Sequence, residues 1–260
     1  MIACAARAGE FAGAIAPRAE QSRRYLLVDD NLPFVDNLAE IVRDAGDEAW
    51  VAESGAQALV LLGRMRFHAL VTDMCMPWMN GAELIHEARR IDPELPAIII
   101  TAYSSAAELH AASREGLLAV LVKPVPIARL LELMGRARRG AVVALLDDDE
   151  AFADNLSELL RDQGFSAVVA SSHAETIHLG GARPFLALAD LRLPGSAEGA
   201  AVARLRELLP LLPVFIVTGF AHQASLPQGL LVFEKPCDSA ALLSAIAQLY
   251  EERAARERTI

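Results

Sequence analysis

Short, continuous apolar runs alternate along the chain with amphipathic stretches of about ten to fifteen residues. Continuous apolar runs of this length are typical of strands that crossover helices bury on both faces. In the first half, strands are predicted at residues 25–28, 48–51, 69–72, 97–101 and 119–122, and helices at roughly 33–45, 55–66, 81–91, 105–115 and 126–138. The pattern therefore predicts an α/β fold with parallel sheets.

The second half of the chain repeats the first. Residues 25–46 (YLLVDDNLPFVDNLAEIVRDAG) align with residues 143–164 (VALLDDDEAFADNLSELLRDQG) at an offset of 118. Further along, DMCMP aligns with DLRLP and the Thr of IIITAY with the Thr of FIVTGF, both at an offset of 117. A repeat of this length is a whole domain rather than a solenoid unit.

The repeat predicts two domains of ordinary size. We place the first at residues 24–139 and the second at 140–252, with a loose leader at 1–23 and a charged tail at 253–260. The last helix is expected from Ala240 to about Arg256. Because only Arg139-Gly140 separates the two domains, we expect them to be rigid neighbours.

Composition narrows the class of protein. A hydrophobic content of 53% and a mean hydropathy of +0.30 indicate a globular chain, and no apolar run approaches the length of a membrane span. The three cysteines (Cys4, Cys75 and Cys237) form no CxxC pair, which suits a reducing cytoplasm and predicts neither a disulfide framework nor a zinc site. The net charge of -10 argues against nucleic acid as a partner.

The chain contains only two lysines, Lys123 and Lys235, and each precedes a proline at the end of an apolar run. The other 22 of its 24 basic Lys and Arg residues are arginines. A chain that otherwise uses arginine keeps lysine where a compact ammonium is needed and a planar guanidinium does not fit. Two such positions, one in each half, indicate that both halves carry the same kind of functional site.

Polar residues of the first half fall where the predicted strands end: Asp29, Asp30, Asp73, Thr101 and Lys123. Ligands bind at this edge of a parallel sheet, where the strand order reverses. Three converging carboxylates need a counter-ion, and an all-oxygen site suits Mg²⁺. With a hydroxyl and an ammonium beside them, the group suits phosphoryl transfer to Asp73 as covalent acceptor. The second half repeats the set as Asp147, Asp148, Asp190, Thr218 and Lys235.

These motifs, in this order, resemble the receiver domains of two-component response regulators, and the resemblance covers roughly residues 24–252. It implies a flavodoxin-like (βα)5 fold in each half, doubly wound, with strand order 2-1-3-4-5. It also implies that Asp73 and Asp190 accept phosphate from a histidine kinase or a histidine phosphotransfer protein. Receivers similar to this one commonly have a cis bond between the lysine and its proline, and we expect one in at least the first domain.

The resemblance also implies a role for each remaining residue. Asp30 and Asp148 would bind Mg²⁺ directly and Asp29 and Asp147 through water, with the main-chain carbonyls of Cys75 and Arg192 as further ligands. Thr101 and Thr218 would donate a hydrogen bond to the phosphoryl group, and Lys123 and Lys235 would pair with it.

Two departures from the family pattern stand out. The aromatic residue that family members often carry three positions before the lysine is Val120 in the first half and Val232 in the second. The second half also has 17 residues from Thr218 to Lys235 where the first has 22 from Thr101 to Lys123. We therefore expect the fourth helix to be shortened in the second domain, with AHQASLPQG forming a loop or a single turn.

The sequence thus predicts a cytoplasmic response regulator with two receiver domains in a phosphorelay. We expect it to act by protein contacts as a monomer or homodimer, without a DNA-binding output domain, a membrane partner or an enzyme activity beyond its own phosphorylation and dephosphorylation. Two alternatives remain, an Mg²⁺-dependent phosphohydrolase with an aspartyl nucleophile and an interaction scaffold that is never phosphorylated. Such hydrolases usually have a second acid two residues after the nucleophile, where this chain has Cys75 and Arg192.

Overall fold

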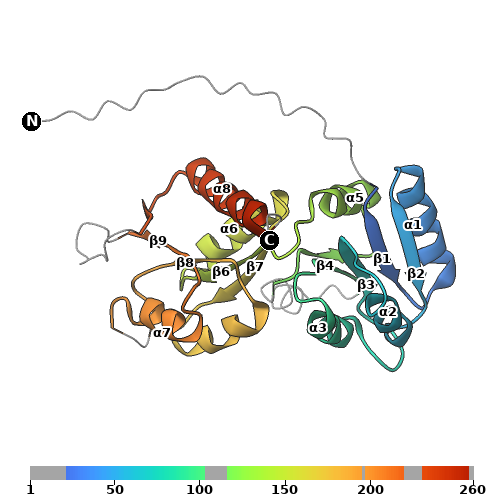
Figure 1. Cartoon of the computed structure of the whole chain (residues 1–260), viewed down its shortest axis with the longest axis horizontal. Coiled ribbons are helices and arrows are strands. Elements are labelled where there is room, and N and C mark those ends of the chain that lie inside the picture. Colours follow the sequence, from blue (N-terminus) through green and yellow to red (C-terminus); the bar gives the residue numbers. More distant parts are fainter. Residues whose placement is uncertain (1–21, 103–115, 195–196, 220–229, 258–260) are drawn as a thin grey trace, which may run out of the picture.

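The computed structural model describes residues 22–102, 116–194, 197–219 and 230–257. It contains two parallel five-stranded sheets, with strand orders β2-β1-β3-β4-β5 and β10-β9-β8-β6-β7 (Figure 1). Read from its other end, the second sheet has the order β7-β6-β8-β9-β10, which corresponds strand for strand to the order of the first sheet. The predicted α/β class and the strand order 2-1-3-4-5 are therefore confirmed in both halves of the chain.

The N-terminal half follows the hydrophobic pattern closely. Its elements are β1 (Arg24–Val28), α1 (Leu32–Asp44), β2 (Glu48–Ala52), α2 (Gly55–Leu62), β3 (Ala69–Asp73), α3 (Gly81–Ile91), β4 (Ala97–Thr101), β5 (Ala119–Val122) and α5 (Ile127–Arg136). All five predicted strands are present within one residue at each end. The helix α2 ends earlier than predicted, because Gly63 follows its last residue. The helix predicted at 105–115 lies outside the described residues.

The C-terminal half repeats this order with one replacement. Its elements are β6 (Val142–Leu146), α6 (Glu150–Asp162), β7 (Ser166–Ala170), η1 (Ala174–Ala182), β8 (Leu186–Ala189), α7 (Ala200–Leu208), β9 (Val214–Thr218), β10 (Val232–Glu234) and α8 (Ser239–Glu257). Where the first half has the α-helix α2, the second has the 3-10 helix η1, so the expectation of a full repeat was wrong here. The segment AETIHLGGA disfavours an α-helix because it contains two glycines and two β-branched residues. The loop predicted at AHQASLPQG lies outside the described residues.

Helices cover both faces of each sheet (Figure 1). In the N-terminal half, α1 and α5 pack on one face around Leu38 and Leu130, and α2 and α3 pack on the other around Leu62 and Leu84. In the C-terminal half, α6 and α8 share one face, and η1 and α7 share the other. Every residue of β3 and β4 is buried, which explains the apolar runs 69–71 and 97–100 that begin these strands.

The two halves contact each other along β7, the edge strand of the second sheet. The Gly116 amide, just before β5, donates to the Ala167 carbonyl at 2.8 Å, and the Arg138 amide donates to the Gly164 carbonyl at 3.2 Å. The edge of β7 is thus partly capped by the other half of the chain, which limits pairing with foreign strands.

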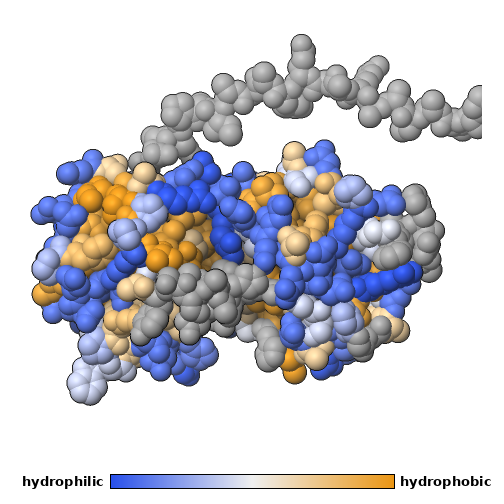
Figure 2. Space-filling view, turned by 180° about the vertical axis from the view of Figure 1, so that it is seen from behind, coloured by the Kyte–Doolittle hydropathy of each residue, from blue (hydrophilic) through white to orange (hydrophobic). Residues whose placement is uncertain are grey.

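The surface carries hydrophilic areas and apolar patches on both halves (Figure 2). Among the described residues, no helix combines the length and the apolar character that a membrane crossing requires.

Candidate functional site

The carboxyl edge of the first sheet brings together the acidic residues that the sequence singled out. Asp29 follows β1 and Asp73 ends β3, and these strands are hydrogen-bonded neighbours with Val28 opposite Thr72. Both carboxylates are buried, with only 3% of Asp29 and 5% of Asp73 exposed. Two buried carboxylates side by side require compensating charge.

Lys123, at the end of β5, supplies that charge. Its Nζ lies 2.6 Å from Asp73 Oδ1 and 3.0 Å from Asp29 Oδ2. Burial alone would lower the pKa of Lys123, but hydrogen bonds to Asp73 and Asp29, together with their charges, outweigh burial and raise it. The ammonium therefore stays protonated and holds both carboxylates in place.

Backbone amides fix the other carboxylate oxygens. The Cys75 amide donates to Asp73 Oδ2 at 2.6 Å, and the Asn31 amide donates to Asp29 Oδ1 at 2.8 Å. Asn31 also caps α1 by accepting a bond from the Phe34 amide, so the helix starts immediately behind the acidic pair. Each buried carboxylate is oriented by one main-chain donor and one ammonium, which are charge-assisted hydrogen bonds.

The C-terminal half builds the same arrangement. Lys235 Nζ lies 2.6 Å from Asp147 Oδ2 and 3.1 Å from Asp190 Oδ2. The Thr218 hydroxyl, at the end of β9, donates to Asp190 Oδ1 at 2.9 Å, and the Arg192 amide donates to the same oxygen at 3.1 Å. The predicted lysine, threonine and acceptor aspartate of this half therefore converge on one point.

The charges of this second site are strongly coupled. Burial raises the pKa of Asp147, although the hydrogen bond and charge of Lys235 act in the opposite direction. Burial alone would lower the pKa of Lys235, but its bonds to Asp147 and Asp190 outweigh that effect and raise it. We expect a charged pair at neutral pH, because the two groups are in direct contact and each stabilises the ionised form of the other.

Three carboxylates of the C-terminal half can share one cation. Asp147, Asp148 and Asp190 each offer an oxygen, and these oxygens lie within 4.8 Å of one another. Within the described ranges, no other group of three or more His, Cys, Asp or Glu side chains meets this condition, and Asp29, Asp30 and Asp73 fall short of it. Carboxylate oxygens at this spacing fit a hard divalent cation such as Mg²⁺.

Two phenylalanines complete the sites, and the sequence reasoning gave them no role. Lys123 Nζ lies 4.9 Å from the centre of the Phe34 ring, and Lys235 Nζ lies 4.3 Å from that of Phe152. An ammonium at this distance from an aromatic face is stabilised by a cation–π interaction. Recurrence of Phe in the repeated frame was the signal that could have identified them.

The remaining predicted residues lie at or near the same edges. Thr101 is buried at the end of β4, and Asp30 and Asp148 are exposed beside their buried neighbours. The bonds Lys123-Pro124 and Lys235-Pro236 are both cis, as predicted. Val120 packs against the core beside β4, and Val232 is 36% exposed. Because both residues are valines, neither half has an aromatic residue at this position.

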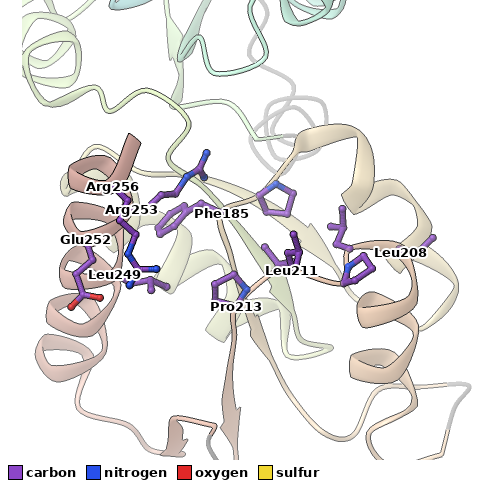
Figure 3. A pocket seen from close by; sticks show the side chains of 12 residues that line it. Phe185, Leu208, Leu211, Pro213, Leu249, Glu252, Arg253 and Arg256 are labelled. Carbon is purple, nitrogen blue, oxygen red and sulfur yellow. The ribbon is translucent and has the colours of Figure 1, made fainter. Parts of the chain in front are cut away.

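A separate apolar groove of about 590 Å³ lies at the opposite end of the C-terminal half (Figure 3). Leu208 and Leu211 approach it from α7 and the following loop, and Leu249, Arg253 and Arg256 approach it from α8. It lies at the amino ends of the strands, because the lining residues Phe185 and Pro213 immediately precede β8 and β9. None of the predicted site residues lines this groove.

Comparison with known proteins gives consistent results. Residues 25–134 match the model of the response regulator receiver domain. A response regulator receiver protein of Anaeromyxobacter sp. (strain Fw109-5) is 55% identical over 232 residues, which cover 89% of this chain and 97% of that protein. The transcriptional regulatory protein GlrR of Escherichia coli (strain K12) is 35% identical over 100 residues, or 38% of this chain but only 22% of that protein.

Each of two solved structures covers less than half of this chain. A CheY-like response regulator receiver domain protein from Methanospirillum hungatei JF-1 is 28% identical, with a TM-score of 0.42, and covers 44% of this chain and 92% of that chain. A response regulator protein from Burkholderia pseudomallei, solved with a phosphorylated aspartic acid, calcium ion and citrate, is 26% identical, with a TM-score of 0.40 over 42% of this chain and 65% of that chain.

Proposed function

The chain belongs to the response regulator receiver family, and on that basis we propose that it accepts phosphoryl groups at two sites, on Asp73 and Asp190. The observation that carries the proposal is the repeated contact of one lysine with two buried carboxylates, Lys123 in one half and Lys235 in the other. Each half then acts as one receiver domain, residues 24–139 and 140–252.

The chemistry follows from the groups around each acceptor. One oxygen of Asp73 attacks phosphorus, a new O–P bond forms, and the bond from phosphorus to the donor's histidine nitrogen breaks. The Cys75 amide holds the second oxygen of Asp73, so the nucleophile is oriented before the donor arrives. Lys123 exchanges its carboxylate partner for the phosphoryl oxygens, and Thr101 donates its hydroxyl to them.

A divalent cation fits this scheme. Asp29 and Asp30 in one half, and Asp147 and Asp148 in the other, would hold Mg²⁺ together with the acceptor and the carbonyl of Cys75 or Arg192. When bound, Mg²⁺ stabilises negative charge on the phosphoryl oxygens. The cluster of Asp147, Asp148 and Asp190 supports this assignment.

The partner that donates phosphate is a histidine kinase or a histidine phosphotransfer protein, and the chain passes its signal on by protein contacts in a cytoplasmic phosphorelay. A net charge of -10 and the free thiols of Cys75 and Cys237 support that setting. A phosphohydrolase is disfavoured, because Cys75 and Arg192 present main-chain amides to the acceptors where such an enzyme needs an acid.

Intact-mass measurement after incubation with acetyl phosphate and Mg²⁺ tests the proposal. We expect two added phosphoryl groups, of which Asp73→Asn removes one and Asp190→Asn the other. Asp36→Asn, on the exposed side of α1, is the matched control and should keep both. Unchanged uptake in the double variant would rule out both acceptors.

A further inference from the structure

The apolar groove at the amino ends of β8 and β9 has two walls (Figure 3). One wall is the end of α7 with the loop after it, where residues 208–213 are four leucines and two prolines. The other wall is the end of α8, which presents Leu249, Glu252, Arg253 and Arg256. These four positions follow the spacing i, i+3, i+4 and i+7, so one face of the helix borders the groove.

The equivalent surface of the N-terminal half is covered by the rest of the chain. It lies at the end of α3, where Asp92 accepts hydrogen bonds from Arg139 of the junction. Glu94 follows two residues later, and its carboxylate is 3.6 Å from the Arg253 guanidinium of α8. At this position of the repeat, acidic side chains therefore bind arginines of the segments that pack on them.

The C-terminal half has leucines where the first half has these two acids. At the offset of 117 residues, Leu209 takes the place of Asp92 and Leu211 takes that of Glu94. The flanking prolines are kept, because PELP of the first half corresponds to PLLP of the second. Leu211 lines the groove and is 96% exposed. A contiguous apolar surface of this kind, where the same scaffold also carries acids, is typical of a contact with another protein.

The charged side chains of the groove can pair with those of a second copy. Glu252 and Arg256 lie about one turn apart on α8, and both border the groove. If the ends of two α8 helices meet antiparallel around a two-fold axis, Glu252 of each copy faces Arg256 of the other. A parallel arrangement would instead place like charges together. The charge pattern is therefore complementary to itself in one orientation only.

We propose that this groove is the contact of a symmetric homodimer, in which Leu211 of each copy packs into the groove of the other. The surface combines a projecting leucine with an apolar hollow, so it can match a copy of itself, as a two-fold contact requires. The contact lies at the amino ends of the strands, at the opposite end of this half from Asp190. Each copy therefore keeps its Asp190 site open to a donor.

Sedimentation velocity of the full chain over a range of concentrations tests this inference. We expect a dimer whose dissociation constant rises about thirtyfold in Leu211→Glu, because the new carboxylate would be buried in an apolar contact. The change should not affect folding, since the side chain is exposed and the repeat already has glutamate at this position. Val60→Glu, at an apolar position of α2 that is 52% exposed, is the matched control and should leave the dissociation constant unchanged.

Charge exchange tests the two-fold arrangement separately. Glu252→Arg and Arg256→Glu should each weaken the dimer about tenfold, because each places two like-charged pairs across the axis. The double variant restores both opposite-charge pairs and should return the dissociation constant to within about threefold of the parent. If the double variant stays as weak as the single ones, the antiparallel pairing is wrong.

Two results would overturn the dimer itself. One is a parent chain that remains monomeric up to about 0.1 mM, which would leave the groove to a foreign protein or a small apolar ligand. The other is a dimer whose dissociation constant in Leu211→Glu stays within about threefold of the parent value, which would place the contact on another surface. Neither result bears on phosphoryl uptake at Asp73 and Asp190, so this inference and the proposed function can fail independently.

Discussion

The guanidinium of Arg139 donates hydrogen bonds to both carboxylate oxygens of Asp92, at 2.6 and 2.8 Å. Asp92 closes α3 in the N-terminal half and is 1% exposed, whereas Arg139 lies in the junction that leads to β6. The same guanidinium donates to the Phe67 carbonyl, and Tyr250 of α8 donates its hydroxyl to the Arg139 carbonyl at 2.7 Å. The junction is therefore fixed to both halves by hydrogen bonds.

Arg139→Lys should destabilise the protein although the charge is kept. Nη2 of Arg139 donates to both Asp92 oxygens while Nη1 donates to the Phe67 carbonyl, and an ammonium has only one nitrogen to serve these two groups. We expect the free energy of unfolding to fall by about 2 kcal/mol in urea titrations. Arg90→Lys, which alters an exposed ion pair with Glu87, should change it by about 0.5 kcal/mol or less. Equal effects of the two changes would show that the Arg139 bonds contribute no more than a surface pair.

Asp92 should make stability sensitive to acid. Burial alone would raise the pKa of Asp92, but hydrogen bonds and charges from Arg139 and Arg66 outweigh burial and lower it below the ordinary 3.8. A carboxyl with a lowered folded pKa contributes stability above its unfolded pKa, and this contribution is lost as the pH falls through the folded value. Urea titrations from pH 7 to pH 3 should therefore show a smaller acid loss for Asp92→Asn, which starts from a lower stability at pH 7. Parallel curves for the two proteins would contradict this role.

Gly164→Ala should cost more stability than Gly46→Ala. The two glycines are equivalent in the repeat, and both have positive φ, 80° and 94°. A Cβ at Gly164 would lie 1.8 Å from the Arg136 carbonyl oxygen of the other half, whereas a Cβ at Gly46 meets nothing within 4 Å. Gly46→Ala should lose about 1 kcal/mol from backbone strain alone. Gly164→Ala should lose roughly a further 2 kcal/mol, because the contact between the halves must open.

Comparing Gly164→Ala in the whole chain and in a fragment separates the cost of the contact between the halves from that of local backbone strain. Gly164→Ala in a fragment that starts at residue 140 lacks the Arg136 carbonyl, so if the fragment folds, its loss should match that of Gly46→Ala in the whole chain. A full-chain difference below about 0.5 kcal/mol between the two variants would show that the halves separate without cost.

Much of the fold could be predicted because the strands are buried on both faces. A buried parallel strand such as β4 leaves a short, continuous run of apolar residues, and every residue of Ala97–Thr101 is buried. The carboxyl ends of parallel strands lie at one edge of the sheet, so the sequence also predicted that Asp73 and Lys123 lie near each other. In the structure these two side chains are in direct contact.

The rest depends on contacts that leave no periodic signal. The glycines and β-branched residues of 174–182 disfavour an α-helix, but they do not specify the 3-10 form that η1 adopts. The contact between Gly164 and Arg136 joins residues of different halves, and only the positive φ of the glycine could be suspected from its place after a helix. The exposure of Trp78, which is 102% in the loop between β3 and α3, was also hidden, because an apolar residue in a loop can equally contact the core.

Lys235→Arg should impair phosphoryl uptake at Asp190 although the charge is kept. Lys235 Nζ lies between Asp147 and Asp190 and 4.3 Å from the centre of the Phe152 ring, and its side chain is 19% exposed. A planar guanidinium is broader than an ammonium and presents a fixed fork, so it fits this space only if Phe152 or a carboxylate moves. Displacements of this kind weaken reactions that depend on alignment.

The measurement uses Asp73→Asn as the parent, so that uptake from acetyl phosphate reports Asp190 alone. We expect the rate in Lys235→Arg to fall about tenfold or more. Arg204→Lys makes the reverse exchange in an exposed pair with Glu207 on α7, and it should leave the rate unchanged. Uptake by Lys235→Arg at the parent rate would mean that the site needs only a positive charge there. The presence of lysine at two positions of an otherwise arginine-only chain would then have no explanation in the shape of the cation.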